Sequence, residues 1–409
     1  MDTADTPAKP APRPINLTEL SLDPRGIGFV QDPYRAYETM HQMLPVFRWA
    51  EYGMICFARH AHVAALLRDK RFGRVPPAGL EAEKPAHLAP FDAVERHSLL
   101  ELEPPDHTRL RGLVNREFVT ARIEALRPAV EKLCEELIAA FPAEGPFDLL
   151  KAYATPIPVM IIADFIGVPR EAAPMLLAWS HAMVAMYQAK RTRETETAAA
   201  SAAAEFAACL RGVVARRRLA PRDDLLSRLI RHEGKSLNED ELVSTCILLL
   251  NAGHEATVHT IGNGVKAIIE SGIDAAQAFA GKAAARKTGE EVLRFAPPLH
   301  MFTRYAQRDC EFKGLPFKQG QQAGLLLAAA NRDPSVFESP DVFDPKRGKN
   351  PHVSFGAGIH FCLGAPLARL ELEIALTALF KARPNLKISD PPYFGDTYHF
   401  HGLGALMVE

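Results

Sequence analysis

The sequence predicts a mainly α-helical protein with small β-sheets, folded as a single domain over residues 17–409. Apolar residues recur at helical spacing along most of the chain, and only one pair of short strand-forming runs stands out. No linker or internal repeat divides the remaining sequence, and 409 residues suffice for one large domain. Residues 1–16 are rich in proline and polar side chains, so we expect a disordered tail there.

The first predicted elements are a helix and a hairpin. The helix covers 32–43 and begins at an Asp-Pro pair, which favours a helix start. The runs VFRWA and MICFA, separated by EYG, have the composition of two short paired strands. Further helices follow from periodicity and helix propensity over 107–118, 121–141, 155–166, 171–187 and 195–218.

The second half of the chain is predicted to contain three more helices. A long one begins after Asn238, a favourable cap that is followed by acidic residues. Another covers 285–295 and ends before two prolines, and the chain over about 330–360 is expected to be irregular. A last amphipathic helix follows Cys362, because leucine and isoleucine then recur at steps of four, three and four.

Composition excludes several classes of protein. The hydrophobic content of 47% and charged content of 24% are typical of a soluble globular protein, and the net charge of −1 argues against general nucleic-acid binding. The longest apolar runs fall short of the roughly 20 residues that span a membrane, and the first residues lack the apolar core of a signal peptide. Six scattered cysteines without a C-x-x-C pair favour no disulfide framework or zinc site. We therefore expect a cytoplasmic protein with no membrane or nucleic-acid partner.

The stretch NAGHEATVH, residues 251–259, partly resembles a zinc-protease helix. That chemistry needs two histidines at i and i+4, whereas His254 and His259 stand at i and i+5. The two side chains are then about 140° apart around an ideal helix. This pair of histidines cannot close on one zinc ion.

The stretch FGAGIHFCLG, residues 355–364, carries a stronger signal. Its glycines suit a tight loop that approaches another body closely, and Cys362 stands just before a helix. Backbone N–H groups and the positive helix end would stabilise a thiolate there, as an axial haem ligand requires. Taken alone, Cys362 is better interpreted as a buried cysteine in a glycine-rich turn, and only the surrounding motifs favour a haem ligand.

Several motifs together resemble the cytochrome P450 haem-thiolate monooxygenases of the soluble bacterial type. The loop matches F-G-x-G-x-H-x-C-x-G at every fixed position, EVLR matches E-x-x-R, and HTRLR matches H-x-x-x-R. FDPKR, FTRYA and ANRDP are also similar to stretches of that family, and the motifs keep the family's order. The resemblance implies the cytochrome P450 fold, with haem b between the long central helix and the helix that follows Cys362.

The resemblance also implies roles for individual residues. Cys362 would be the axial ligand of the haem iron, and Phe355 would pack beside its sulfur. The haem propionates would be held by His107, Arg111, Arg304 and His360, whose N–H donors suit carboxylates. A buried structural network would be formed by Glu291, Arg294 and Arg347.

The central helix departs from the family pattern at one position. The family usually has [A/G]-G-x-[D/E]-T, and Ala256 stands where the threonine is expected. Glu255 would relay protons through water to the oxygen-binding site. The missing hydroxyl could be replaced by Thr257, about 100° away around the helix, or by a hydroxyl of the substrate. Poor coupling with release of hydrogen peroxide is the third explanation.

Substrate and electron donor are the remaining expectations. The predicted pocket is mainly apolar and suits a small-to-medium hydrophobic substrate; its residues are Leu248, Asn251, Ala252, Leu299, Met301, Phe302 and Phe400. Three histidines could recognise a polar group or simply face solvent: His300, His399 and His401.

The chain has no flavin, nicotinamide or Fe–S motif, so the resemblance implies O2 and electrons from an Fe–S ferredoxin with its NAD(P)H-dependent reductase. A basic docking face, or merely solvated charges, would be formed by Arg109, Arg116, Lys346, Lys349 and Arg369. We expect a monomer. The alternatives are peroxide-driven or redox-neutral chemistry on the same haem, and a haem-based binding or sensor protein.

Overall fold

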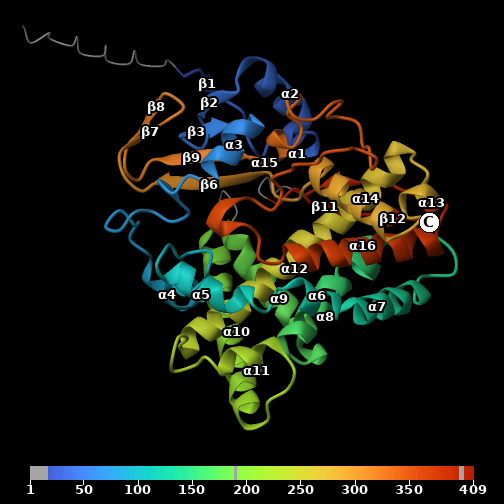
Figure 1. Ribbon diagram of the computed structural model, residues 1–409, viewed down its shortest axis with the longest axis horizontal. Coiled ribbons are helices and arrows are strands. Elements are labelled where there is room, and N and C mark those ends of the chain that lie inside the picture. Colours follow the sequence, from blue (N-terminus) through green and yellow to red (C-terminus); the bar gives the residue numbers. More distant parts are fainter. Residues whose placement is uncertain (1–16, 188–190, 396–399) are drawn as a thin grey trace, which may run out of the picture.

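The helices occupy one large body and most strands gather at one side of it (Figure 1). The computed structural model describes residues 17–187, 191–395 and 400–409. The predicted tail, 1–16, and His399 lie outside the described residues. The mainly helical class with small sheets is confirmed.

The first half of the helical body begins with short helices and continues with longer ones. In chain order these are α1 (Ile27–Gln31), α2 (Tyr34–Met43), α3 (His60–Leu66), α4 (Ala89–Glu95), α5 (Asp106–Asn115), α6 (Thr120–Glu124), α7 (Arg127–Ala139), α8 (Pro156–Ile166), α9 (Ala173–Val184) and α10 (Arg193–Leu219). The predicted helices over 32–43, 107–118, 155–166 and 195–218 correspond to single helices here, and the one over 171–187 corresponds to α9 with a short 3-10 helix at each end. The one over 121–141 is divided into α6 and α7.

The second half contains the longest helix of the described chain. Its helices are α11 (Leu225–Ile230), α12 (Glu239–Ser271), α13 (Ala275–Ala278), α14 (Lys282–Phe295), α15 (Leu327–Ala330) and α16 (Ala365–Ala382). The predicted cap of α12 is confirmed: the Asn238 side chain accepts from the Glu241 N–H, and the Glu241 carboxylate accepts from the Asn238 N–H. Helix α16 packs against α7, α12 and α14, and Figure 1 shows it running in front of α12.

The strands form one six-stranded sheet and three two-stranded sheets. The large sheet has the order β1-β2-β3-β9-β6-β4. The strands are β1 (Glu19–Leu20), β2 (Val46–Trp49), β3 (Met54–Phe57), β4 (Phe72–Gly73), β5 (Phe147–Asp148), β6 (Met301–Ala306), β7 (Cys310–Phe312), β8 (Leu315–Phe317), β9 (Gln322–Leu326), β10 (Tyr393–Phe394), β11 (Leu403–Ala405) and β12 (Met407–Val408). The predicted hairpin is confirmed as the antiparallel pair β2–β3.

The large sheet separates two apolar clusters, because successive side chains of a strand point to opposite faces. In β3, Ile55 and Phe57 belong to one cluster, whereas Met54 and Cys56 belong to the other. A third and larger cluster fills the helical body. The cysteine loop and α12 thus lie where the sheet and the helical body meet (Figure 1).

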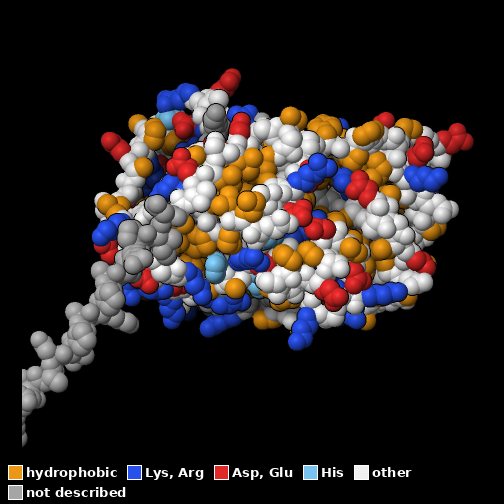
Figure 2. All heavy atoms as spheres, turned by 90° about the horizontal axis from the view of Figure 1, so that it is seen from above, with side chains coloured by type: hydrophobic (Ala, Val, Ile, Leu, Met, Phe, Trp, Pro, Cys, Tyr) orange, Lys and Arg blue, Asp and Glu red, His pale blue; other side chains and the backbone are white. Residues whose placement is uncertain are grey.

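One described helix, α10, is long and apolar enough to cross a membrane by length and composition. Half of its most apolar window is buried, and its buried alanines belong to the core of the helical body. Packing against α4 and α9 therefore accounts for its apolar character. On the face seen in Figure 2, basic and acidic side chains are intermixed with apolar ones.

Candidate active site

The loop before Cys362 is shaped by two glycines in the left-handed region. Gly356 has φ +67° and Gly358 has φ +74°. A Cβ at Gly358 would lie 2.5 Å from the Leu67 carbonyl oxygen, and one at Gly356 would lie 3.3 Å from the Phe302 ring. The predicted close approach of this loop to other parts of the chain is therefore observed. The Cys362 N–H donates to the Phe355 carbonyl at 2.9 Å and closes the loop.

The thiol of Cys362 lies in an environment with opposing electrostatic effects. Burial raises its pKa above the ordinary value. The Gly364 and Ala365 N–H groups and the charges of Arg111 and Arg369 act in the opposite direction. The N–H donors at the start of α16 are those that the sequence predicted, but they do not outweigh burial. A positive charge bound at the sulfur would favour the thiolate further.

Two histidines predicted to bind propionates lie side by side. The rings of His107 and His360 are 4.3 Å apart between centroids. His107 is buried, its Nε2 has no hydrogen-bond partner among the described residues, and burial lowers its pKa to about 4. His360 Nε2 lies 3.2 Å from Oε1 of Glu103. The pair therefore presents one unsatisfied buried ring nitrogen beside an acid.

Two arginines add positive charge to this region. Arg304 is 3% exposed, and its guanidinium makes one hydrogen bond within the described chain, to the Thr303 carbonyl. Burial, followed by the nearby charge of Arg74, lowers the pKa of Arg304 to about 10. Arg111 instead donates to the Phe361 carbonyl and to Asn115. Among the described residues, Glu103 is the carboxylate that faces Arg304 and the histidine pair. The cradle formed by His107, Arg304 and His360 therefore suits further carboxylates.

Helix α12 has one stripe that the protein does not cover. Ala252 has an exposed side chain in the middle of this helix, and Leu248 and Ala256, one turn to either side, are half-buried. Positions i, i+4 and i+8 lie on one face of a helix. Most other side chains between 241 and 268 are buried. The residues predicted to face oxygen and substrate thus line an open, apolar face.

The acid of the central helix is surrounded by histidines. Oε2 of Glu255 lies 3.3 Å from His181 Nε2 and 3.2 Å from His254 Nε2, and its Oε1 lies 3.4 Å from His259 Nε2. Burial would raise the pKa of Glu255, but the three histidines hold it far below its ordinary range. The hydroxyl of Thr257 donates to the Gly253 carbonyl at 3.2 Å, within the helix.

The three residues predicted to form a structural network are in contact. Arg294 donates to Glu291 through Nε at 2.8 Å and through a terminal nitrogen at 2.6 Å, and Arg347 Nε lies 3.4 Å from Glu291. Arg294 is fully buried and also donates to carbonyl oxygens of the irregular segment between α15 and α16: those of Asn331, Pro340 and Val342. The pair therefore ties α14 to that segment.

The structure brings only part of the predicted substrate pocket together. Leu299 and Phe400 are joined by an antiparallel bridge. Phe302 contacts the cysteine loop at Gly356 and lies under the Arg304 guanidinium, 5.8 Å from it. Asn251 contacts Met183 of α9 through its amide nitrogen at 3.6 Å.

One expectation about this region is wrong, and one of two open alternatives is excluded. Met301 belongs to the apolar cluster on the opposite face of the sheet, because it is adjacent to Phe302 in strand β6 and adjacent strand residues alternate. Its side chain packs the sheet rather than the pocket. His300 and His401 do not face solvent: both are buried, with ring centroids 4.3 Å apart, and His300 Nδ1 lies 2.9 Å from the Tyr37 hydroxyl.

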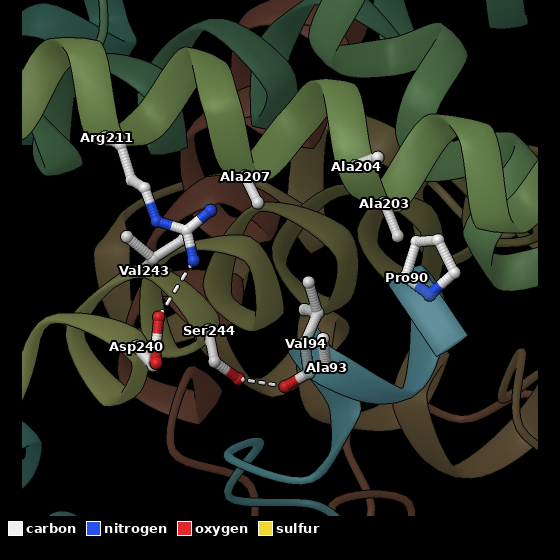
Figure 3. Close-up of a pocket in the computed structure, with 10 residues that line it drawn as sticks. All are labelled: Pro90, Ala93, Val94, Ala203, Ala204, Ala207, Arg211, Asp240, Val243 and Ser244. Atoms are coloured by element: carbon white, nitrogen blue, oxygen red, sulfur yellow. Dashed lines mark hydrogen bonds and ion pairs between the residues drawn. The ribbon is translucent and has the colours of Figure 1, made fainter. Parts of the chain in front are cut away.

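A separate cavity of about 240 Å³ lies between α4, α10 and the first turns of α12 (Figure 3). It is lined mainly by small apolar side chains. It is bordered by the Arg211–Asp240 ion pair at 2.8 Å, and by the bond at 2.8 Å that the Ser244 hydroxyl donates to the Val94 carbonyl. Its described lining contains none of the predicted site residues.

Comparison with known proteins decides the family. The family model described as Cytochrome P450 matches residues 285–382. The polyketide biosynthesis cytochrome P450 PksS of Bacillus subtilis (strain 168) is 33% identical over 388 residues, which cover 92% of this chain and 94% of that protein. This chain belongs to the cytochrome P450 family.

Other relatives and solved structures agree over the whole length. The vitamin D(3) 25-hydroxylase of Pseudonocardia autotrophica is 35% identical over 393 residues, 93% of this chain and 94% of the relative. The crystal structure of P450BioI, in complex with an acyl carrier protein ligated to hexadec-9Z-enoic acid, has a TM-score of 0.88 at 32% identity and covers 93% of this chain and 99% of that one. Epothilone D-bound cytochrome P450epoK also has a TM-score of 0.88, at 30% identity, covering 95% and 98%.

This cytochrome P450 is accordingly an oxygen-incorporating oxidoreductase with haem b as its cofactor. Its residues fit that group. The unsatisfied Nε2 of His107 and the buried Arg304 offer N–H donors for carboxylates, and the uncovered Ala252 leaves room beside α12. The half-buried Cys362 thiol, with N–H donors aimed at its sulfur, suits an iron ligand.

The predicted docking face of this cytochrome P450 is partly neutralised. Arg109 is ion-paired with Glu241, and Arg369 is bonded to both oxygens of Glu290 at 2.6 and 3.0 Å. The other three basic residues have exposed side chains: Arg116, Lys346 and Lys349.

Sequence reasoning missed three residues of the site. Glu103 lies beside His360, and Arg74 lies near Arg304, but neither residue belongs to a motif that the sequence shares with the family. His181 lies on a different helix from Glu255, which it contacts. The sequence gives a weak indication for Glu103, because it stands only four residues before His107 and would lie near that side chain. For Arg74 and His181, no local pattern in the sequence indicates the contact.

Proposed function

We propose that this cytochrome P450 inserts one atom of O2 into a C–H bond of a small-to-medium hydrophobic substrate, by hydroxylation or O-dealkylation. Electrons would come from an Fe–S ferredoxin and its NAD(P)H-dependent reductase, in the cytoplasm. The observation that carries the proposal is the open apolar stripe Leu248–Ala252–Ala256 beside the half-buried, ion-paired Glu255. An apolar face binds the substrate, and the acid next to it serves proton transfer.

The haem, when bound, supplies the iron at which dioxygen is activated, with Cys362 as its thiolate ligand. His107, Arg304 and His360 would hold its carboxylates from the cradle described above, and Arg111 braces the cysteine loop through the Phe361 carbonyl. The Phe355 carbonyl fixes the Cys362 backbone, and the Phe355 ring would pack beside the sulfur and limit water there. The network of Glu291, Arg294 and Arg347 serves folding rather than chemistry.

Proton supply is assigned to Glu255 together with His181. The Glu255 carboxylate raises the pKa of His181, whose side chain is 54% exposed. His181 can therefore take a proton from solvent and hold it beside Glu255 Oε2. Glu255 is ionised at rest, so it would take the proton from His181 and release it at once toward the oxygen-binding site, while His181 takes a new proton from solvent. His254 and His259 orient the carboxylate.

The alanine at position 256 is explained by the substrate. Thr257 donates its hydroxyl proton to the Gly253 carbonyl, so replacing the missing hydroxyl would require breaking that bond. A hydroxyl on the substrate is then the simpler replacement. The test is product formed per reduced nicotinamide consumed, in wild type and in Ala256→Thr. The proposal expects a gain only for substrates without a hydroxyl near the reacting carbon, and an equal gain for all substrates would contradict it.

Substrate class can be found by screening for the low-to-high-spin shift that follows displacement of water from the haem iron. The names of the relatives suggest polyketides, vitamin D3 and acyl chains carried on an acyl carrier protein as the first compounds. Compounds that shift the spectrum should be oxidised with ferredoxin, its reductase and O2. Absence of turnover with every shifting compound under these conditions would contradict the proposal.

A second candidate is peroxide-driven or redox-neutral chemistry on the same haem, and Ala256 is the observation that favours it. Turnover with hydrogen peroxide alone, at a rate equal to or above that with ferredoxin and O2, would favour this second function. A haem-based sensor is disfavoured by Glu255 and its histidines, which a protein without turnover does not need.

A further inference from the structure

Three side chains from two helices converge on one point beside the open face of α12. His181 comes from α9, and His254 and Glu255 come from α12. Their ligand atoms all lie within 4.8 Å of one another. His254 and Glu255 are adjacent in sequence, so the convergence depends on how α9 packs on α12.

The buried histidine of this group has a defined tautomer. His254 is 3% exposed, and its Nδ1 lies 2.8 Å from the Leu250 carbonyl oxygen. A carbonyl only accepts, so Nδ1 carries the hydrogen and Nε2 of the neutral ring carries a lone pair. That Nε2 lies 3.2 Å from Glu255 Oε2 and has no hydrogen-bond partner among the described residues. A lone pair facing a carboxylate oxygen is unfavourable unless a positive charge lies between them, which either a proton or a metal ion can supply.

Two of the three separations match those between ligands on one zinc ion, and the third, between the His181 and His254 nitrogens, is within 4.8 Å. Zinc binds His nitrogen and carboxylate oxygen at about 2.0–2.1 Å in a tetrahedron, which places neighbouring ligand atoms about 3.3 Å apart. The observed separations from Glu255 Oε2 are 3.2 Å to His254 and 3.3 Å to His181. His259, 3.4 Å from the other carboxylate oxygen, fixes the orientation of the carboxylate. A histidine that donates its second ring N–H to a backbone carbonyl is also the usual state of a metal-bound histidine.

We propose that His181, His254 and Glu255 bind one zinc ion, with a water molecule in the fourth position. The ion would join α9 to α12. It would also occupy the carboxylate oxygen that the proposed proton transfer uses, so zinc would inhibit the enzyme reversibly. The zinc-protease pair that the sequence excluded was His254 with His259; here the second histidine comes from another helix.

The test is equilibrium dialysis of the chelator-treated, haem-loaded enzyme against zinc, with elemental analysis of the bound metal. Wild type should bind one zinc ion per chain, and His181→Gln should bind it more than about 100-fold more weakly, since even an outer partner of a ligand contributes 10–100-fold. The matched control is His232→Ala, in the turn after α11, which should bind zinc as wild type does. Magnesium, which prefers oxygen ligands, should not compete.

Two further readouts separate the site from other causes. The haem spectrum of His181→Gln should match that of wild type, which shows that the fold is intact. Diffraction at the zinc absorption edge should place one ion about 2.1 Å from the three named atoms. The proposal is overturned if wild type binds no zinc above the level of His181→Gln, or if the ion lies elsewhere. In that case His181, His254 and Glu255 interact only through a shared proton, as hydrogen-bonded ion pairs.

Discussion

Helix α16, which follows Cys362, contains a buried acid that makes a quantitative prediction possible. Glu371 is 1% exposed, and neither of its carboxylate oxygens has a hydrogen-bond partner in the described part of the chain. Burial raises its pKa to about 8. The folded protein therefore carries this group protonated at neutral pH.

The magnitude follows from linkage between protonation and folding. The ordinary pKa is 4.5, so the unfolded chain ionises Glu371 at a lower pH than the folded protein does. Well below pH 4.5, burial of Glu371 does not lower the free energy of unfolding. As the pH rises from 4.5 to about 8, the free energy of unfolding falls, and above about 8 it falls no further on account of this group. At 1.36 kcal/mol per pH unit, the whole loss is at most about 5 kcal/mol.

The perturbation is Glu371→Gln, and the assay is urea denaturation of the haem-loaded protein, followed by circular dichroism at pH 5 and pH 8.5. The variant should be more stable than wild type by about 4 kcal/mol at pH 8.5, and by less than about 1 kcal/mol at pH 5. The matched control is Glu373→Gln in the same helix. That residue is ion-paired with Arg127 at 2.9 Å and Arg286 at 2.7 Å, so its loss should destabilise the protein at pH 8.5. Parallel pH dependences of wild type and Glu371→Gln would refute the reasoning.

Two further substitutions test the parts that hold the cysteine loop. Arg294→Ala leaves Glu291 buried without its main partner and should cost about 3–5 kcal/mol of folding free energy, measured by denaturation; a loss below about 1 kcal/mol would contradict the structural role. Gly358→Ala places a methyl group 2.5 Å from the Leu67 carbonyl oxygen at φ +74° and should sharply lower haem incorporation, measured as haem per chain. The control there is Gly348→Ala, where a Cβ has open space, and equal haem contents in the two variants would argue against the close approach.

The sequence was sufficient for features that depend on neighbouring residues. The cap of α12 at Asn238, the hairpin β2–β3 and the cysteine loop are each specified by residues that adjoin in the chain. The same holds for the pair Glu291 and Arg294, which stand three residues apart on one helix. Local chemistry therefore predicts most of the helices and the core of the site.

Features that depend on packing between distant segments could not be predicted. His181 meets Glu255 only because α9 lies on α12, and Glu103 meets His360 across more than 250 residues. Met301 was misplaced because β6 was not predicted as a strand, so the alternation of its side chains could not be applied. His300 and His401 are buried by contacts with α1 and α2, through Val30 and Tyr37, which their own sequence neighbours do not reveal.

The central claim, that the Cys362 thiolate binds the haem iron, is tested most directly by the absorption spectrum of the reduced protein treated with carbon monoxide. Thiolate ligation predicts a Soret band displaced far to the red, and Cys362→His should return the band to the position of a nitrogen-ligated haem. A wild-type spectrum already at that position would contradict the account.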